Sequence, residues 1–220
     1  PPTTRYREDP VRMLRAVRFA ARLGFSIEPG TMAAIQKLHA SIGRVSAERV
    51  RDELTRILTE GGARRGLELL EESRLLGDVL PEVRALREVE QPPEFHPEGD
   101  VWTHTLMMLD GLRPPVTTEL AWGVLLHDIG KPGTFRRAPD RIRFDGHVEL
   151  GLELARGILG RLRFSNEETE RVLALIANHM RFMDAPRMRE STLKRFLRME
   201  RFDEHLELHR LDCQSSNGNL

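Results

Sequence analysis

The sequence predicts an all-α fold, and three observations support this prediction. Apolar residues recur with the spacing of one helix face through most of the chain. Typical helix-start residues precede these segments, and glycines follow several of them. The one segment with a different pattern is 135–144, where Pro139-Asp140 lies in the middle and a small hairpin is predicted.

The first part of the chain is predicted to form several short helices. Ser46 is expected to cap the third helix, and Gly77 to end the fourth. Pro81 is a favourable first residue for a further short helix. The four predicted helices before Pro81 cover residues 7–23, 31–40, 46–61 and 63–76.

The second part of the chain follows a predicted linker at 91–99 and holds six of the eight histidines. Asp100 is expected to cap its first helix, and Ser165 and Glu168 form a capping-box pattern. The predicted helices of this part cover residues 100–112, 120–127, 147–162, 165–179, 192–199 and 203–215.

Composition limits the class of protein. The 220 residues include 34 basic and 34 acidic side chains, so a non-specific coat for nucleic acid is disfavoured while a local basic face remains open. Cys213 is the only cysteine, which excludes a disulfide framework and favours a reducing, cytoplasmic location. No apolar run approaches the roughly 18 residues of a membrane span. The chain starts at Pro1 without methionine, and we expect both ends to be cut from a longer protein; the oligomeric state is not predicted.

A set of histidines and aspartates carries the strongest functional signal. His127-Asp128 begins the run HDIGKP directly after an apolar helix. Each neighbour in the set lies about 20 to 35 residues away on another predicted helix, a spacing that suits convergence in a bundle core. A single histidine of this kind is usually a packed core residue, but six suitable residues predict a divalent metal site, for Mg, Mn or Ni. The six are His104, His127, Asp128, His147, His179 and Asp212.

This ordered set resembles that of the HD superfamily of metal-dependent phosphohydrolases, over residues 94–219. The resemblance implies a first metal site at His104, His127, Asp128 and Asp212, which His147 and His179 would extend to two metals. It implies catalytic roles for His127 and Asp128. Lys131 would place a positive charge on a phosphate or, equally, be a solvated loop residue. The other histidines are interpreted as surface or packing residues: His39, His96, His205 and His209.

A helical segment near the start carries arginines on one face. At 100° per residue, Arg12, Arg15, Arg18 and Arg22 fall within an arc of about 120°, opposite an apolar arc. Guanidinium groups bind triphosphates and RNA phosphates well. The alternative is a solvated arginine face with acidic residues nearby.

Asp9 and Arg12 admit two interpretations. Asp9 before Pro10 is a typical helix cap. However, a carboxylate beside a guanidinium also offers an acceptor next to a donor. Adenine and cytosine present the complementary amino group and bare ring nitrogen, whereas guanine and uracil do not, so such a pair would select A and C.

The stretch Glu8-Asp9-x-x-Arg12 resembles the neck of class II tRNA nucleotidyltransferases and bacterial poly(A) polymerases, and residues 45–54 resemble the family's next motif. The resemblance implies that Glu8, Asp9 and Arg12 select ATP or CTP, with Arg15 and Arg18 as candidates for the triphosphate. It implies a tRNA or another RNA 3′ end as partner. The expected organisation is a neck over 1–62, a connector over 63–93 and an HD domain over 94–220.

The family's catalytic head carries a Gly-Gly phosphate-binding turn, an Asp-x-Asp pair and an Arg-Arg-Asp motif. Neither the Asp-x-Asp pair nor the Arg-Arg-Asp motif occurs in these 220 residues, and the Gly-Gly at 61–62 only ends a predicted helix. We therefore expect the neck and HD parts of an RNA 3′-end nucleotidyltransferase that cannot add nucleotides without a head. Two alternatives stay open. One is a stand-alone HD phosphohydrolase acting on nucleotides or cyclic phosphates, and the other is a tRNA-binding module whose HD site is inactive.

Overall fold

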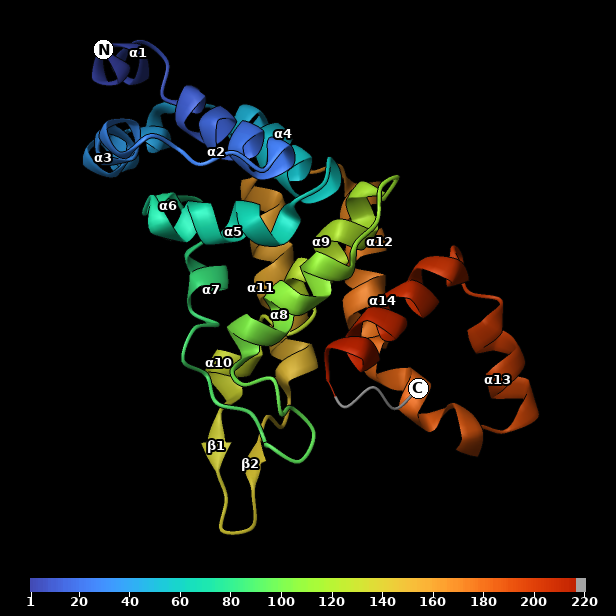
Figure 1. Cartoon of the computed structure of the whole chain (residues 1–220). Coiled ribbons are helices and arrows are strands. Elements are labelled where there is room, and N and C mark those ends of the chain that lie inside the picture. Colours follow the sequence, from blue (N-terminus) through green and yellow to red (C-terminus); the bar gives the residue numbers. More distant parts are fainter. Residues whose placement is uncertain (217–220) are drawn as a thin grey trace.

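A computed structural model describes residues 1–216, and its regular structure is almost entirely helical, as predicted (Figure 1). The first part of the chain forms short helices and one 3-10 segment, η1 (His39–Arg44). Its helices are α1 (Pro2–Glu8), α2 (Val11–Leu23), α3 (Pro29–Leu38), α4 (Ala47–Thr59), α5 (Ala63–Glu72), α6 (Leu75–Val79) and α7 (Pro81–Arg84).

The second part adds longer helices, a 3-10 segment η2 (His179–Arg187) and the predicted hairpin. Strands β1 (Arg136–Arg137) and β2 (Ile142–Arg143) pair antiparallel, with Arg136 opposite Arg143. The hairpin projects from the lower end of the molecule in Figure 1. The helices are α8 (Val101–Gly111), α9 (Thr118–Leu126), α10 (Lys131–Thr134), α11 (His147–Arg161), α12 (Asn166–Asn178), α13 (Glu190–Leu197) and α14 (Phe202–Ser215).

Several predicted helix starts are confirmed. Asp100 is the N-cap of α8 and accepts a hydrogen bond from the Thr103 N–H at 2.8 Å. Ser165 and Glu168 form the predicted capping box of α12. Ser46 occupies the N-cap of α4, but its side chain makes no capping hydrogen bond.

Two predicted helices are each split in two. The segment 7–23 breaks at Asp9, which is extended (φ −148°, ψ 97°), because a proline disfavours the helical conformation in the residue before it. Pro10, and not Asp9, is therefore the N-cap of α2. The segment 63–76 breaks at Arg74, which has a left-handed backbone (φ 69°), and Gly77 lies inside α6 and does not end a helix.

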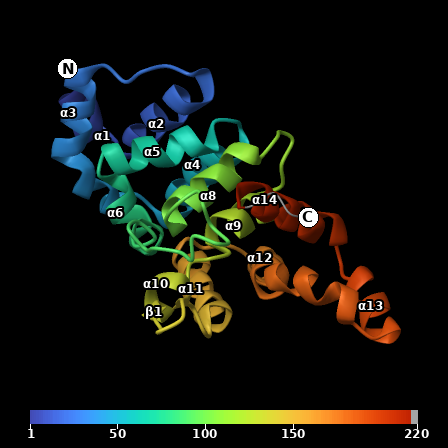
Figure 2. The ribbon, with the colours of Figure 1, turned by 60° about the horizontal axis from the view of Figure 1, so that its bottom comes forward.

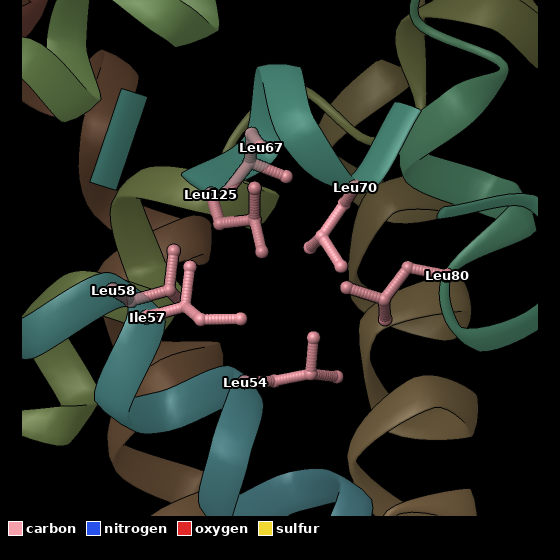
Figure 3. Close-up of a pocket in the computed structure, with 7 residues that line it drawn as sticks. All are labelled: Leu54, Ile57, Leu58, Leu67, Leu70, Leu80 and Leu125. Carbon is pink, nitrogen blue, oxygen red and sulfur yellow. The ribbon is translucent and has the colours of Figure 1, made fainter. Parts of the chain in front are cut away.

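One continuous hydrophobic core joins the two parts of the chain. Helix α4 packs against α2 and α9, and α5 packs against α8. Figure 3 shows the junction, where leucines and Ile57 from α4 and α5 meet Leu80 and Leu125, leaving no room for a water molecule between them. The fully buried Trp122 of α9 donates from Nε1 to Thr55 Oγ1 of α4 at 3.0 Å. Among the described residues, no helix is both long and apolar enough to cross a membrane.

Candidate functional site

The six predicted metal ligands come from different elements and meet in the second part of the chain. His104 lies in α8, His127 and Asp128 directly follow α9, and Asp212 lies in α14. His147 begins α11, and His179 directly follows α12. Figure 2 shows these five helices gathered in one region of the molecule.

The six side chains form two adjoining groups. Ligand atoms of His104, His127 and Asp212 lie within 4.8 Å of one another, and so do those of Asp128, His147 and His179. The adjacent residues His127 and Asp128 join the groups, with 3.1 Å between Nε2 and Oδ2. Asp128 Oδ1 lies 3.8 Å from His147 Nε2 and 3.9 Å from His179 Nε2. Such a pair of neighbouring groups could hold one or two cations.

Three of the histidines are oriented in the same way, by a hydrogen bond to the local backbone. Nδ1 of His127, His147 and His179 lies 2.9, 2.9 and 2.6 Å from the carbonyl oxygen of the residue three positions earlier. A carbonyl accepts only from a protonated nitrogen, so Nδ1 carries the proton and Nε2 is left to face the other side chains. The local backbone thus selects the tautomer that binds a metal through Nε2.

The burial of these nitrogens supports a cation at this place. The Nε2 atoms of His104, His127 and His147 are buried without a hydrogen-bond partner. Buried polar atoms are normally satisfied, because leaving one unpaired costs about 1–3 kcal/mol. A divalent cation bound to these imidazoles and to the two aspartates would satisfy them, so the residues present fit the metal that the sequence predicts.

The electrostatics of the site favour positive charge. Burial would raise the pKa of Asp128, but the neighbouring His127 and Lys131 keep it well below its usual range. Burial likewise opposes the ionised form of Asp212, yet His104, whose Nε2 lies 3.1 Å from Asp212 Oδ1, lowers the pKa of Asp212 to about 2. Burial lowers the pKa of His179 to about 4, so this imidazole stays neutral and able to bind a cation. The site therefore presents carboxylates in their ionised form.

Lys131 is buried and is not the solvated loop residue that the sequence left open. Its Nζ lies 2.7 Å from Asp128 Oδ2 and donates to Gln91 Oε1 at 2.7 Å. It also lies 5.3 Å from the centre of the Phe144 ring. Its positive charge therefore lies beside Asp128, at the edge of the six predicted metal ligands, which we call the metal set.

Steric crowding requires glycine at position 130, the last residue of the HDIG run. A Cβ at Gly130 would lie 2.1 Å from the carbonyl oxygen of His147 and 2.7 Å from the backbone nitrogen of Gly151. Both atoms belong to the first turns of α11, so only glycine lets the turn after His127-Asp128 approach this helix. Gly130 thereby lets Asp128 lie close to His147 at the start of α11.

Sequence reasoning missed residues of the predicted linker. The side chain of Glu98 is buried, and its Oε1 lies 2.8 Å from both His104 Nδ1 and His96 Nδ1. His96, interpreted as a surface or packing residue, is partly buried and contacts Glu98 beside the site. A Pro- and Gly-rich stretch gives no sign that it folds back over a bundle core, so only the spacing His-x-Glu next to a predicted site could have drawn attention to it.

The three other histidines lie outside the site, as interpreted. His39 pairs with Asp78 at 2.5 Å, and His205 is buried. His209 stacks on Phe182, with ring centres 4.5 Å apart.

Asp9 and Arg12 do not pair with each other. Asp9 Oδ2 accepts a hydrogen bond from Arg49 Nη2 at 2.8 Å, which lowers the pKa of Asp9. Arg12 Nη1 donates to Glu8 Oε2 at 3.1 Å. Both contacts lie at the surface, where the start of α2 meets the end of α1 and the first turns of α4.

The remaining arginines of α2 bind acidic residues of α4 and its end. Glu53 is buried and accepts from Arg15 Nε and Arg18 Nε, each at 2.9 Å. Glu60 accepts from Arg18 and Arg22, each at 3.0 Å. Arg18 itself is buried, so this arginine face is largely a salt-bridge network that holds α2 on α4, and a role in triphosphate binding stays a prediction.

Two protein families match the chain. Residues 24–86 match the family described as "Probable RNA and SrmB- binding site of polymerase A", and residues 100–209, half of the chain, match the HD domain. The first match covers α3 to α7, and the second covers all six predicted metal ligands except Asp212.

Relatives are similar over nearly the whole chain. The A-adding tRNA nucleotidyltransferase of Deinococcus radiodurans is 38% identical over 96% of this chain and 50% of its own length. The Multifunctional CCA protein of Halorhodospira halophila is 39% identical over 98% of this chain and 55% of its own. The CC-adding tRNA nucleotidyltransferase of Thermus thermophilus is 39% identical over 88% of this chain and 46% of its own length. The chain thus spans about half the length of these relatives. Its sequence identity to the A-adding, the CC-adding and the multifunctional CCA relative is about the same.

Proposed function

Since the chain belongs to the family of tRNA nucleotidyltransferases and bacterial poly(A) polymerases that carry an HD domain, we propose that it supplies the neck and HD parts of an RNA 3′-end nucleotidyltransferase. In this proposal the neck binds tRNA and selects ATP or CTP, and the HD part hydrolyses phosphate esters with a divalent metal. The similarity across 88–98% of the chain in the three relatives supports this over a stand-alone HD hydrolase, because it includes the neck.

The HD activity rests on one observation above the others: three buried imidazole Nε2 atoms without partners face two ionised aspartates. His104, His127 and Asp212 would hold one cation, and Asp128, His147 and His179 would hold it jointly or take a second. When bound, such a cation neutralises phosphate oxygens and makes water a better nucleophile. Lys131, 2.7 Å from Asp128, would place its charge beside the phosphate.

The hydrolytic role is tested on the chain itself. With Mn²⁺, Ni²⁺ or Mg²⁺ it should hydrolyse a small phosphomonoester or a 2′,3′-cyclic nucleotide. Asp128→Ala should reduce the rate to that of a blank, because Asp128 lies in both the metal set and the Lys131 contact. Asp140→Ala on the exposed hairpin is the matched control and should keep full activity. Activity that persists unchanged in Asp128→Ala would refute the proposed site.

The proposed selection of nucleotides by Asp9 and Arg12 is supported by the low free-energy cost of separating these residues from their present partners. Each is held by a part-exposed ion pair, Asp9 with Arg49 and Arg12 with Glu8. Such pairs contribute about 0–1 kcal/mol, so an incoming base could replace them at low cost. Arg15 is similarly half-exposed, whereas Arg18 would have to leave two glutamates in a buried setting. Arg15 is therefore the more accessible candidate for the triphosphate.

The selection proposal is tested in a protein in which this neck is joined to a catalytic head. Arg12→Ala should weaken the preference for A and C over G and U, because the donor to the bare ring nitrogen is lost. Loss of one charge-assisted hydrogen bond of about 1.5–3 kcal/mol corresponds to a preference that is weaker by roughly 10- to 150-fold. Single-nucleotide incorporation with each of the four triphosphates measures the preference. Arg7→Ala, which removes an exposed arginine of α1, is the control; an unchanged preference in Arg12→Ala would contradict the role.

A further inference from the structure

Glu98 differs from every other group that orients a histidine of the metal set. His127, His147 and His179 each place Nδ1 against a carbonyl oxygen of the backbone. His104 alone has a side chain in this position, and that side chain is a carboxylate. Because a backbone carbonyl remains whatever the side chain, Glu98 is the one orienting group here that substitution can remove.

The surroundings of Glu98 hold its carboxylate in one position. Its Oε1 lies 2.8 Å from Nδ1 of both His104 and His96. The two rings are 5.1 Å apart and meet edge to face at 83°. Oε2 is buried and has no hydrogen-bond partner. The two imidazoles are thus the contacts that the structure gives this buried carboxylate, and nothing in the described surroundings draws it away from His104.

On the other side of the ring, His104 Nε2 lies 3.1 Å from Asp212 Oδ1 and belongs to the group with His127. The imidazole therefore connects Glu98 with the metal set. We propose that Glu98 is a positioning residue of the metal centre: it accepts the Nδ1 proton of His104 and thereby keeps Nε2 of that ring free and aimed at the cation. This inference rests on the proposed metal function.

The physical consequence is an effect on metal affinity. A carboxylate at the second nitrogen of a ligating histidine fixes the tautomer and the ring orientation and makes the imidazole a stronger base. Removing such an outer partner typically lowers metal affinity by 10- to 100-fold. A separate cation at His96, Glu98 and His104 is disfavoured, because His104 would have to give both ring nitrogens to cations and keep no proton.

The test measures binding of Co²⁺ to the full chain after removal of metal with a chelator. Co²⁺ reports through its visible absorption, which follows both affinity and the geometry of its ligands. Glu98→Ala should raise the Kd by roughly 10- to 100-fold and alter the absorption bands. Glu98→Gln keeps the shape and one acceptor oxygen but loses the charge, so its Kd should lie between those of the wild type and Glu98→Ala. The matched control is Glu90→Gln, which removes an exposed partner of Arg137 and should leave the Kd unchanged.

The outcomes are distinguishable. A wild-type Kd and spectrum in Glu98→Ala would overturn the positioning role while leaving the metal function intact. Loss of one equivalent of Co²⁺ with unchanged affinity for the rest would also overturn it, in favour of a separate cation site. Failure of the wild type itself to bind Co²⁺ would refute the metal function and this inference with it. If thermal melts show that Glu98→Ala is unfolded without metal, the isosteric Glu98→Gln decides by the same criteria.

Discussion

Gly130 is the residue on which the approach of the His127-Asp128 turn to α11 depends. We expect Gly130→Ala to destabilise the protein by about 1–3 kcal/mol or more, because the new methyl group would meet backbone atoms that cannot turn away. Displacement of His147 should also weaken metal binding. Thermal melts with and without added metal measure both effects.

The control for this substitution lies in the same part of the fold. A Cβ at Gly157 of α11 would meet nothing within 4 Å, so Gly157→Ala should stabilise the helix by up to about 1 kcal/mol. If Gly130→Ala were as stable as Gly157→Ala, the close approach would not be a constraint of the native fold.

The convergence of the candidate metal ligands could be predicted from the sequence, but their contacts with the linker could not. His104, His127 and Asp212 converge because their helices pack, and helical periodicity is visible in sequence. Glu98 and Gln91 bind their partners only because an irregular segment folds over the bundle. Burial of such a segment depends on tertiary contacts, which leave no periodic trace.

Helix α2 is held on α4 by the buried Glu53. We expect Glu53→Ala to destabilise the protein by about 3 kcal/mol, because Arg18 stays buried with one of its two carboxylate partners removed. Glu48→Ala, at an exposed site on the same helix, should change stability by less than about 1 kcal/mol. Chemical denaturation of both variants measures the difference. Equal stabilities would contradict the role of Glu53 in holding α2 on α4.

The ends of elements were predicted well where a side chain caps the helix and poorly where the backbone breaks it. Asp100, Ser165 and Glu168 carry their signal in their own chemistry. The break at Arg74 has no such signal, since a left-handed backbone is uncommon for arginine and nothing in its own chemistry favours it. The break at Asp9 does have a signal in the sequence, because Pro10 disfavours the helical conformation in the residue before it.

At the scale of the whole molecule, the neck and HD parts form one packed body. Trp122 reaches Thr55 across the junction, and Arg161 binds both carboxylate oxygens of Glu82, at 2.6 and 2.9 Å. The predicted boundaries at 62 and 93 therefore divide a continuous core, and they remain predictions about organisation along the chain. Figures 1 and 2 show the helices of the first part of the chain beside the helices that carry the predicted metal ligands.

The proposed metal site can be tested directly through the metal content of the purified chain. Elemental analysis should be made on untagged wild type, on the double variant His127→Ala plus Asp128→Ala, and on the surface control His39→Ala. We predict that the wild type and the control variant carry a divalent transition metal. The double variant should have lost this metal, because His127 and Asp128 link both groups of ligands. Equal metal content in the wild type and the double variant would contradict the account.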